Sequence, residues 1–252
     1  EPQYDETTLH DFRLAAKINI QLASYRFTWG LHAWETGIPV MRPFGLMYPE
    51  DGRHPDDTYL LGPDLLVAPI VSEDPKREIP IPEGKWIDFW TGVIDEGPTQ
   101  VEREVAMDSI ALWLREGAIV PMLRKDADTL GTTTSADVVS VSQDPGTLTW
   151  IVVPGIDNSY TNHDSSVLSH TSEASVLIKL SPGDLFKSFA LDLRFGSETQ
   201  LPEQLKFQGQ ELATVESEDA FKECDTPCYF TVPEQGRIHV FVGEVTAAES
   251  EL

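Results

Sequence analysis

Acidic side chains are the most abundant residues in this chain that could perform acid–base or nucleophilic chemistry. The sequence has 252 residues, of which 42 are Asp or Glu. A retaining glycosidase holds two carboxylates about 5–5.5 Å apart across a sugar. The acids with suggestive neighbours are Asp51, Asp56, Asp57, Asp64 and Asp88. The first three lie in a predicted loop, where turn formation explains them. Since Asp64 and Asp88 adjoin apolar strand residues, we predict structural roles for them as well.

The histidines and serines form no reactive motif. No two histidines have the i,i+4 spacing, with a Glu, that a helical zinc site uses. His163, Asp164 and His170 share one predicted polar loop, and we predict no metal there. Ser24 and Ser109 lack a Gly-x-Ser-x-Gly elbow. The sequence therefore predicts no catalytic residue, no cofactor site and no metal site within the chain.

The cysteines, Cys224 and Cys228, are separated by three residues in Cys-Asp-Thr-Pro-Cys. This spacing differs from the Cys-x-x-Cys redox motif, and the stretch has no further residues to complete a metal site. We favour a small disulfide loop over two free thiols. A disulfide would indicate an exported protein, extracellular or periplasmic.

The charge balance excludes some partners. The formal net charge is −24, with 18 Lys and Arg. Such a field repels nucleic acid and anionic membranes, and no run approaches the roughly 18 apolar residues of a membrane span. The chain shows no signal peptide and begins with Glu1, which fits a processed subunit, a trimmed mature chain or a fragment.

Aromatic residues are concentrated in the first half of the β region. Trp86, Phe89, Trp90 and Trp113 could stack on a sugar. Large aromatics at strand spacing more commonly belong to a core, and we predict that role.

A long helix is predicted over residues 8–36. Thr8, with Asp11 three residues later, fits a capping box, and Gly37 fits the residue that ends a helix. Its apolar residues, which include Phe12, Leu22, Phe27 and Trp34, surround most of its circumference. Such a helix packs on several sides, so we expect a large partner outside this chain.

The rest of the chain predicts a mainly β fold of two antiparallel β-sandwich domains, because short apolar runs alternate with turn residues. The predicted domains are 1–38 (helix), 39–130 (proximal sandwich) and 131–252 (distal sandwich). The predicted strands are 59–61, 65–71, 77–81, 85–90, 100–106, 110–114, 118–122, 137–142, 147–153, 158–162, 174–180, 186–195, 204–208, 211–216, 227–232 and 237–243. We expect the tail from Thr246 to fray.

Four segments together resemble glycoside hydrolase family 31, the α-glucosidase and α-xylosidase group. They are Pro-Val-Met-Arg-Pro at 39–43, Tyr-Leu-Leu-Gly-Pro-Asp-Leu-Leu-Val-Ala-Pro at 59–69, Pro-Glu-Gly-Lys-Trp-Ile-Asp-Phe-Trp-Thr-Gly at 82–92 and Leu-Trp-Leu-Arg-Glu-Gly-Ala-Ile-Val-Pro at 112–121. In that family they follow the catalytic (β/α)8 barrel, and helix 8–36 resembles the last barrel helix. Residues 152–164 resemble a hairpin of the distal domain, although Asn-His-Asp-Ser-Ser at 162–166 departs from it.

The resemblance implies an enzyme whose active site lies elsewhere. The Asp nucleophile and Asp general acid of the family lie upstream of the last barrel helix, and no Asp here lies in a matching motif. The expected function is that of a C-terminal segment or subunit of a retaining α-glycosidase, which hydrolyses α-glycosidic bonds of oligosaccharides or glycosides. Its expected partners are the catalytic barrel and a carbohydrate substrate. The alternative is a non-catalytic carbohydrate-binding or structural β-sandwich module.

Overall fold

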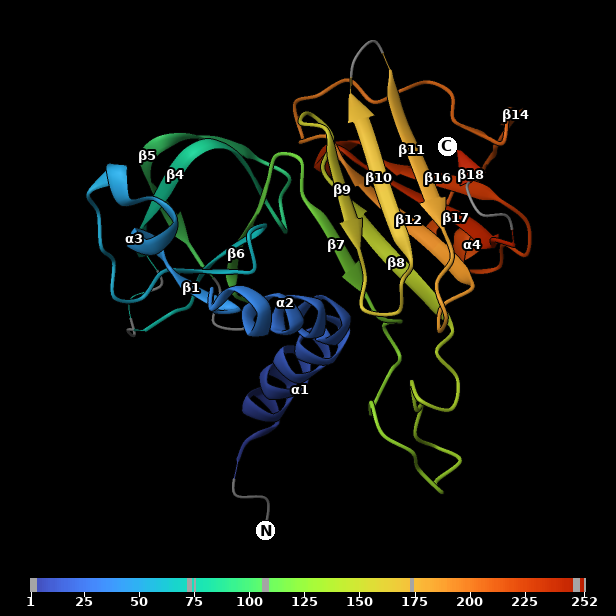
Figure 1. The fold of residues 1–252 in the computed structure, drawn as a ribbon, viewed down its shortest axis with the longest axis horizontal. Coiled ribbons are helices and arrows are strands. Elements are labelled where there is room, and N and C mark those ends of the chain that lie inside the picture. The colour runs from blue at the N-terminus through green and yellow to red at the C-terminus, as the bar shows by residue number, and fades with distance from the viewer. Residues whose placement is uncertain are drawn as a thin grey trace.

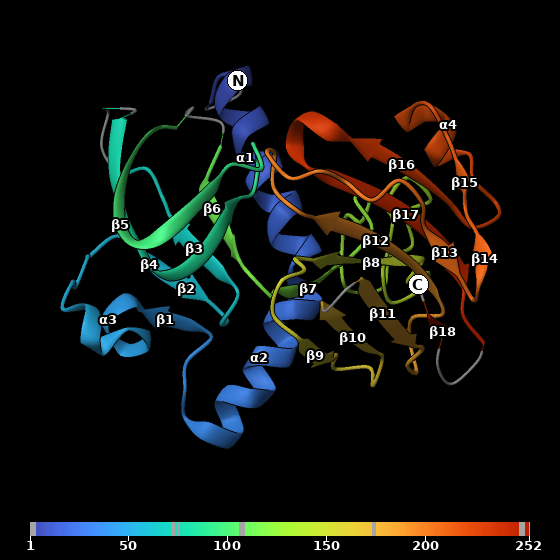
Figure 2. The same cartoon turned by 90° about the horizontal axis from the view of Figure 1, so that it is seen from above.

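The structure is a computed structural model that describes residues 4–71, 74, 76–105, 109–172, 175–246 and the backbone of 250–251. It is mainly β, as predicted, with helices at the N-terminus (Figure 1). Figure 2 shows these helices running between a first sheet and a pair of packed sheets. No helix in the described ranges is long and apolar enough to cross a membrane.

The predicted N-terminal helix is present as α1 (Glu6–Gln21) and α2 (Ala23–Thr36). The predicted cap at Thr8 is wrong, since the side chain of Asp5 accepts a hydrogen bond from the Thr8 N–H at 2.7 Å. An acid before the first turn both caps the N–H groups and suits the helix dipole. The helix is interrupted at Leu22, a buried residue, and ends at Gly37 in the left-handed conformation, as predicted.

The first sheet has the order β1-β2-β3-β6-β4-β5, and all its described pairings are antiparallel. Its strands are β1 (Met41–Pro43), β2 (Tyr59–Leu61), β3 (Leu65–Ala68), β4 (Lys76–Asp88), β5 (Ile94–Glu104) and β6 (Ala111–Arg115). Between β1 and β2 lie α3 (Phe44–Met47) and the 3-10 turn η1 (Pro49–Asp51). The predicted strands 77–81 and 85–90 are joined in β4, whose register with β5 shifts between Ile81 and Gly84. The sheet curves around its own core, in which Trp86 and Trp113 are fully buried. All described strands from Met41 to Arg115 lie in this one sheet, so a proximal sandwich is not confirmed.

Two further sheets lie face to face and share a core that includes Trp150 and Tyr160 (Figure 1). The six-stranded sheet, in the order β15-β16-β17-β12-β8-β7, contains β7 (Ile119–Met122), β8 (Thr147–Val152), β12 (Ser188–Arg194), β15 (Ala213–Thr214), β16 (Cys228–Val232) and β17 (Arg237–Glu244). The four-stranded sheet, in the order β18-β11-β10-β9, contains β9 (Asn158–Thr161), β10 (Val167–Ser172), β11 (Val176–Ser181) and β18 (Ser250–Glu251). Smaller elements are β13 (Lys206–Phe207), β14 (Gln210–Glu211), α4 (Glu218–Lys222) and the 3-10 turn η2 (Pro233–Gln235).

Several local predictions need correction. Strand β7 pairs with β8 rather than with the strands before it, because Gly117, at φ +82, turns the chain into the second region. Strand β12 runs parallel to β8, although an antiparallel arrangement was expected. Residues 137–142 form only a bridge, between Ser140 and Thr129. The C-terminal tail is ordered at β18, which pairs with β11, and residues 247–249 lie outside the described ranges.

The first sheet meets the six-stranded sheet at a seam of glycines. A Cβ atom at Gly92 would collide with the carbonyl oxygen of Gln235, and one at Gly196 would collide with the Ile94 side chain. Across the same seam the Ser197 N–H donates to the Gly92 carbonyl at 2.8 Å. The backbones of the two regions therefore touch at Gly92, and the Ile94 side chain packs against Gly196 beside this contact.

Candidate functional site

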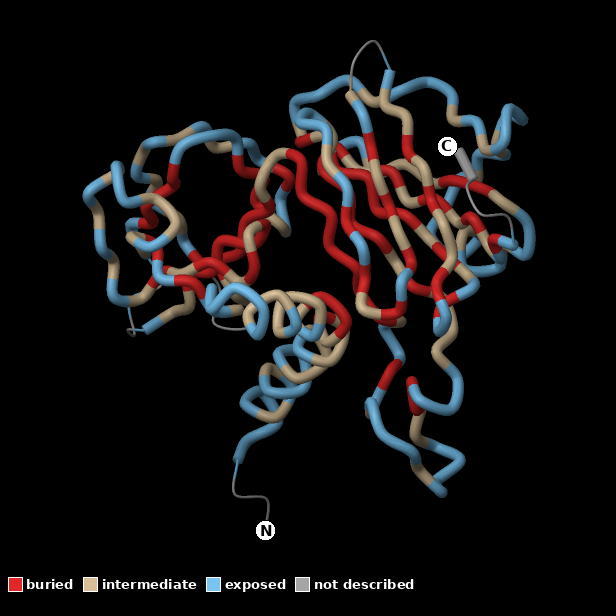
Figure 3. Tube along the Cα trace, viewed as in Figure 1, coloured by how far each residue is buried: buried red, intermediate tan, exposed pale blue. Residues whose placement is uncertain are grey.

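The outer side of the two helices exposes an apolar surface. Phe27, Leu31 and Trp34 have i, i+4, i+7 spacing, which places them on one side of α2. Their exposed fractions are 58%, 47% and 89%, and Phe12 on α1 is 71% exposed. Helix α1 has no buried residue, as its tan and blue colours show (Figure 3). We call Phe12, Phe27, Leu31 and Trp34 the helical apolar face.

The inner side of α2 packs against this chain. The ring of Tyr25, which is fully buried, stacks on Tyr160 with the centroids 6.1 Å apart. Trp29 meets the same Tyr160 ring edge-on, and the Arg42 guanidinium lies 4.9 Å from the Trp29 ring centroid. Since Tyr25 and Trp29 lie opposite the helical apolar face, α2 has two apolar sides, of which this chain covers one.

A buried carboxylate, Asp64, fixes this inner side. The Tyr25 hydroxyl donates to its Oδ2 at 3.2 Å, and Arg115 Nη2 lies 3.3 Å from its Oδ1. Burial raises the pKa of Asp64 to about 6, against the opposing effects of Arg115 and Tyr25. Gly62, at φ +59, has no room for a Cβ atom beside the Tyr25 ring. The turn at residues 62–64 therefore receives the tyrosine, and Asp64 ties the helix to the first sheet.

A cavity of about 350 Å³ adjoins Asp64, between α2 and β9. It is also lined by Trp29, His32, Arg115 and Tyr160, and Asp64 is the only acid among the described lining residues. A glycosidase site needs a second carboxylate across the sugar. This cavity therefore does not have the groups for glycoside cleavage.

Residues 162–166 form a second attachment point for α2. Asn162 Oδ1 accepts hydrogen bonds from Ser24 at 3.0 Å and Thr28 at 3.1 Å. The carboxylate of Asp164 accepts from Asn162, from Ser166 and from the Phe186 N–H. Burial alone would raise the pKa of Asp164, but these hydrogen bonds lower it overall. The side chains of this loop, where the resemblance in sequence breaks off, thus hold the helix.

His163 and His170 do not lie in one loop, although the sequence predicted a shared polar loop. His163 lies in the loop, with its ring 5.1 Å from that of Phe27. His170 lies on β10 and is buried, with Nε2 3.4 Å from the Gly117 carbonyl oxygen. Strand β10 escaped prediction because its sequence has few apolar residues and the polar His170 occupies one of its buried positions. Among the described residues, no group of three or more His, Cys, Asp or Glu side chains is arranged to hold a metal ion.

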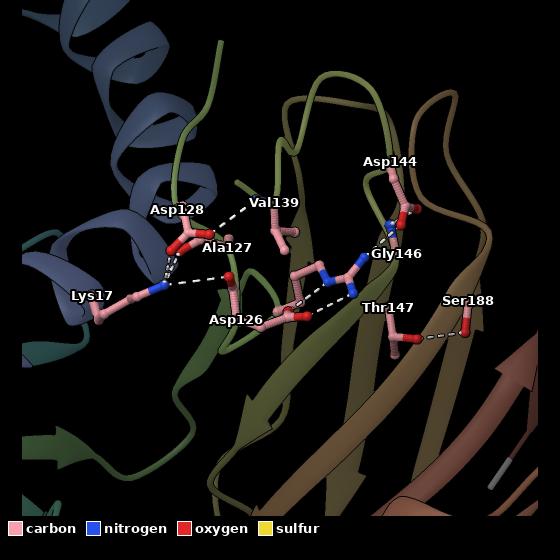
Figure 4. Close-up of polar contacts among 10 residues, drawn as sticks. Lys17, Asp126, Ala127, Asp128, Val139, Asp144, Gly146, Thr147 and Ser188 are labelled. Carbon is pink, nitrogen blue, oxygen red and sulfur yellow. Dashed lines mark hydrogen bonds and ion pairs between the residues drawn. The ribbon is translucent and has the colours of Figure 1, made fainter. Parts of the chain in front are cut away.

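Lys17 attaches α1 to the segment that follows β7 (Figure 4). Its Nζ donates to the Ala127 carbonyl at 2.8 Å and to Asp128 Oδ1 at 2.6 Å. The Leu123 N–H donates to the Gln21 carbonyl at 2.8 Å. Both helices are thus held by the β regions. Most of the helical apolar face points away from these regions, and Phe27 at its edge contacts His163.

The remaining candidate acids make local contacts. Asp88 Oδ1 accepts hydrogen bonds from the backbone N–H groups of Trp90 and Thr91, each at 2.9 Å, and so shapes the turn after β4. Asp57 pairs with Arg77 at 2.7 Å. Asp51 bonds to Arg53, a hydrogen bond that lowers its pKa. Asp56 is exposed in the same loop. These contacts fit the predicted structural roles.

The predicted core aromatics divide into two groups. Trp86 and Trp113 are fully buried, as predicted, and Trp113 Nε1 donates to Asp95 at 2.9 Å. Trp90 is 39% exposed, and its indole donates to the Ile110 carbonyl at 2.7 Å. Phe89 is partly buried under the Arg194 guanidinium, 4.0 Å from the ring centroid.

A buried ionic network on β12 and β17 was not predicted. Asp192 Oδ2 accepts hydrogen bonds from Arg194 Nη2 and Arg237 Nη2, each at 2.8 Å. Burial alone would raise the pKa of Asp192, but the two guanidiniums hold it well below its ordinary value. Burial lowers the pKa of the neighbouring His239 to about 4, and Arg237 contributes in the same direction against the opposing effect of Asp192. The sequence signal that could have revealed this network is the alternation of polar and apolar residues in both strands. The predicted disulfide between Cys224 and Cys228 is present nearby.

Comparisons with known proteins identify the first β region. Residues 37–120 match the glycosyl hydrolase family 31 C-terminal domain. An alpha-glucosidase of Saccharolobus solfataricus is 33% identical over 42% of this chain and 15% of its own length. A 1,6-alpha-glucosyltransferase of Sporosarcina globispora is 27% identical over 79% of this chain and 16% of its own length. The solved cycloalternan-forming enzyme of Listeria monocytogenes, at 26% identity and a TM-score of 0.83, covers 98% of this chain, which matches 23% of that enzyme. The chain thus spans less than a quarter of each relative.

Proposed function

Because this chain belongs to glycoside hydrolase family 31 and carries its C-terminal domain, we propose that it is the C-terminal segment or subunit of a retaining α-glycosidase. The helical apolar face carries the proposal. Exposed apolar patches of this kind mark contact surfaces, since soluble monomers rarely leave them uncovered. A catalytic barrel is the partner that the family supplies.

In this proposal α1 and α2 complete the catalytic barrel, and the β regions brace it. The inner side of α2 is held by Asp64 and Asn162, and α1 is held by Lys17. A helix fixed in this way presents its other side in one orientation. The packed sheets of residues 119–251 would form the distal sandwich, and the curved first sheet would form the proximal domain.

The proposed reaction is double displacement at an α-glycosidic bond through a covalent glycosyl-enzyme intermediate. Its two carboxylates would come from the barrel. Water would resolve the intermediate in hydrolysis. The Sporosarcina glucosyltransferase and the Listeria cycloalternan-forming enzyme match most of this chain, which favours transfer to a sugar hydroxyl as the alternative outcome.

The compartment is also a proposal. The disulfide between Cys224 and Cys228 is of a kind that persists in oxidising surroundings. We place the enzyme outside the cytoplasm, in the extracellular space or periplasm. Labelling of free thiols in protein from intact cells checks this point, since reduced cysteines would contradict it.

Purification of the native protein tests the assembly. We expect this chain either to copurify with a barrel-sized chain or to be part of a longer precursor, and the preparation to release sugar from an α-linked aryl glycoside with retained anomeric configuration by NMR. A chain that migrates alone without a barrel-sized partner or precursor contradicts the proposal. A monomeric, soluble chain whose residues 8–36 resist protease would favour the non-catalytic module.

A matched pair of leucines tests the helical apolar face. Leu31 on the face and Leu46 on α3 are 47% and 54% exposed. Leu31→Ser should weaken the association with the barrel roughly tenfold, because loss of one well-packed apolar side chain costs more than about 1 kcal/mol. Leu46→Ser should leave the association unchanged in ultracentrifugation. Equal effects of the two substitutions would show that α2 is not the contact surface.

A further inference from the structure

A cleft of about 850 Å³ opens on the outer face of the six-stranded sheet. Its floor consists of Thr147 and Thr149 from β8, Phe230 from β16, and Arg237 and His239 from β17. These residues alternate along their strands with core residues such as Trp150 and Val240, so they point away from the four-stranded sheet. The volume falls within the range of small-molecule sites.

The polar floor is held in place by neighbouring residues on the same face of the sheet. Arg237 donates to Asp192 through Nε at 3.1 Å and Nη2 at 2.8 Å, and its Nη1 donates to Gln235 at 3.0 Å. The ring of His239 stacks on Phe230 with the centroids 6.3 Å apart and the planes at 12°. A polar surface that is already oriented loses little conformational freedom when it binds a ligand.

Both walls of the cleft are also fixed. On one side Arg124 is held by Asp126 at 2.6 and 2.7 Å and by Asp144 at 2.7 Å. Gly146 leaves room for the Arg124 guanidinium, because a Cβ atom at position 146 would approach Arg124 Nη1 to 2.8 Å. Figure 4 shows Asp126, Asp144 and Gly146 close to Thr147.

The opposite wall is helix α4, which contributes Glu218, Phe221 and Lys222 to the cleft. The Cys224–Cys228 disulfide joins the segment after α4 to the first residue of β16. The ring centroid of Phe221 lies 6.1 Å from that of His239. The disulfide therefore keeps an aromatic side chain over the floor of the cleft.

The charges of the cleft favour an uncharged ligand. Three lining cations, Arg124, Lys222 and Arg237, already have carboxylate partners. Lys125 is the one lining cation without a carboxylate in ion-pair range among the described residues. A net charge of −24 on the whole chain repels anions. The four cationic side chains of the lining outnumber its two acids, Asp126 and Glu218, which disfavours a cation. The cleft thus offers hydroxyl, imidazole and guanidinium groups beside aromatic faces, and it favours neither sign of charge in a ligand.

We propose that this cleft binds a neutral oligosaccharide. Sugar hydroxyls both donate and accept hydrogen bonds, which matches the mixture of Thr149, His239 and Arg237, and the apolar faces of sugar rings match Phe221 and Phe230. The proposal depends on the geometry of the cleft and does not require the proposed glycosidase activity. In a glycosidase the cleft is a second sugar-binding site outside the barrel.

Hydrogen exchange on the full-length enzyme that contains this chain tests the proposal, with maltoheptaose and isomaltoheptaose as probes. We expect either sugar to slow exchange in peptides that cover residues 218–222 and 228–239. Protection confined to other parts of the enzyme, or no protection with either sugar, overturns the proposal. Sugar cleavage without protection here rejects only the cleft, and protection here without cleavage rejects only the glycosidase.

Substitutions of residues in the cleft test whether these residues bind the sugar. Phe230→Ala should weaken the sugar affinity at this site at least about tenfold, from the loss of one stacking face. Thr149→Val, which keeps the side-chain shape, should weaken it severalfold and provides the test if Phe230→Ala fails to fold. Thr171→Val, at an exposed threonine on β10, is the matched control and should bind as the wild type does. Wild-type affinity in both cleft variants overturns the assignment.

Discussion

Two buried carboxylates, Asp64 and Asp192, lie in different regions of the molecule and have pKa values shifted in opposite directions. Asp64 joins α2 to the first sheet with one tyrosine and one arginine, and its pKa rises to about 6. Asp192 lies in the six-stranded sheet with two arginines, which hold its pKa well below the ordinary value. Burial is similar at both sites, so the number and exposure of the cationic partners decide the direction of the pKa shift. Depth in the fold alone therefore does not reveal how a carboxylate contributes to stability.

The largest expected effect is at Asp192. Asp192→Asn leaves Arg194 buried without its charge partner and removes the partner of Arg237, and should lower the free energy of unfolding by about 3–5 kcal/mol. Urea unfolding measures the loss. Asp126→Asn, at an exposed acid paired with Arg124, is the control and should cost less than about 1 kcal/mol. Similar losses in the two variants would show that burial does not determine how much an ion pair contributes to stability.

The next effect is a pH dependence at Asp64. Because its pKa rises from 3.8 to about 6 on folding, the folded state binds the proton more tightly. Its contribution to stability is therefore largest below pH 3.8 and falls by about 3 kcal/mol as the pH rises through 6. Asp192 has the opposite dependence, since its contribution is full above its ordinary pKa and is lost as the pH falls below it.

The measurement is the difference in unfolding free energy between wild type and Asp64→Asn at pH 4 and pH 7. Taking this difference cancels the titration of His239, which is present in both proteins and changes stability in the other direction over the same pH range. Asp51→Asn is the control, because its pKa is lowered. A difference for Asp64→Asn that stays constant with pH would show that the pKa of Asp64 does not change on folding.

Tyr25 should have an intermediate effect. Tyr25→Phe removes the hydroxyl that donates to Asp64, which should cost about 2 kcal/mol at pH 7, as for hydrogen bonds to charged groups. The pKa of Asp64 should rise further in this variant. Tyr59→Phe, at a partly buried tyrosine that has no carboxylate partner among the described residues, should change stability by less than about 0.5 kcal/mol in thermal unfolding.

The smallest effect is expected at Arg115. Its side chain is 40% exposed, so its attraction to Asp64 is screened by solvent. Arg115→Met should cost less than about 1 kcal/mol, and added salt should reduce the difference from wild type. Arg194→Met is the comparison, because Arg194 is buried and its loss should be several times larger and insensitive to salt. If Arg115→Met and Arg194→Met caused losses of equal size that do not depend on salt, the arginine partners of Asp64 and Asp192 would not differ as we expect.

Local signals in the sequence predicted the parts of the fold that depend on nearby residues. Gly37 ends the helix, most strands follow the runs of branched and aromatic residues, and Cys224 pairs with Cys228. The parts that depend on distant partners were harder to predict. The parallel pairing of β8 with β12 and the crossing at Gly117 leave no local signature.

The sites divide in the same way. Asp64 was assigned a structural role from its apolar neighbours, but its partner Tyr25 is 39 residues away in the chain. The partners of Asp192 include Arg237, 45 residues away, so the alternation of polar and apolar residues in β12 could not show this pairing. The residues that line the outer cleft come from four separate segments of the chain, so their spacing in the sequence does not predict the cleft.

The glycine seam has a mechanical consequence. Arg194 reaches across it, bonding Asp192 on one side and the Phe89 carbonyl, at 2.6 Å, on the other. Backbone meets backbone at Gly92, while the Arg194 and Ile94 side chains pack across the rest of the joint. Because such close packing resists compression, the joint should hold the first sheet at a fixed distance from the six-stranded sheet. In the proposed enzyme, a long sugar held in the outer cleft would then lie at a set offset from whatever covers the helical apolar face.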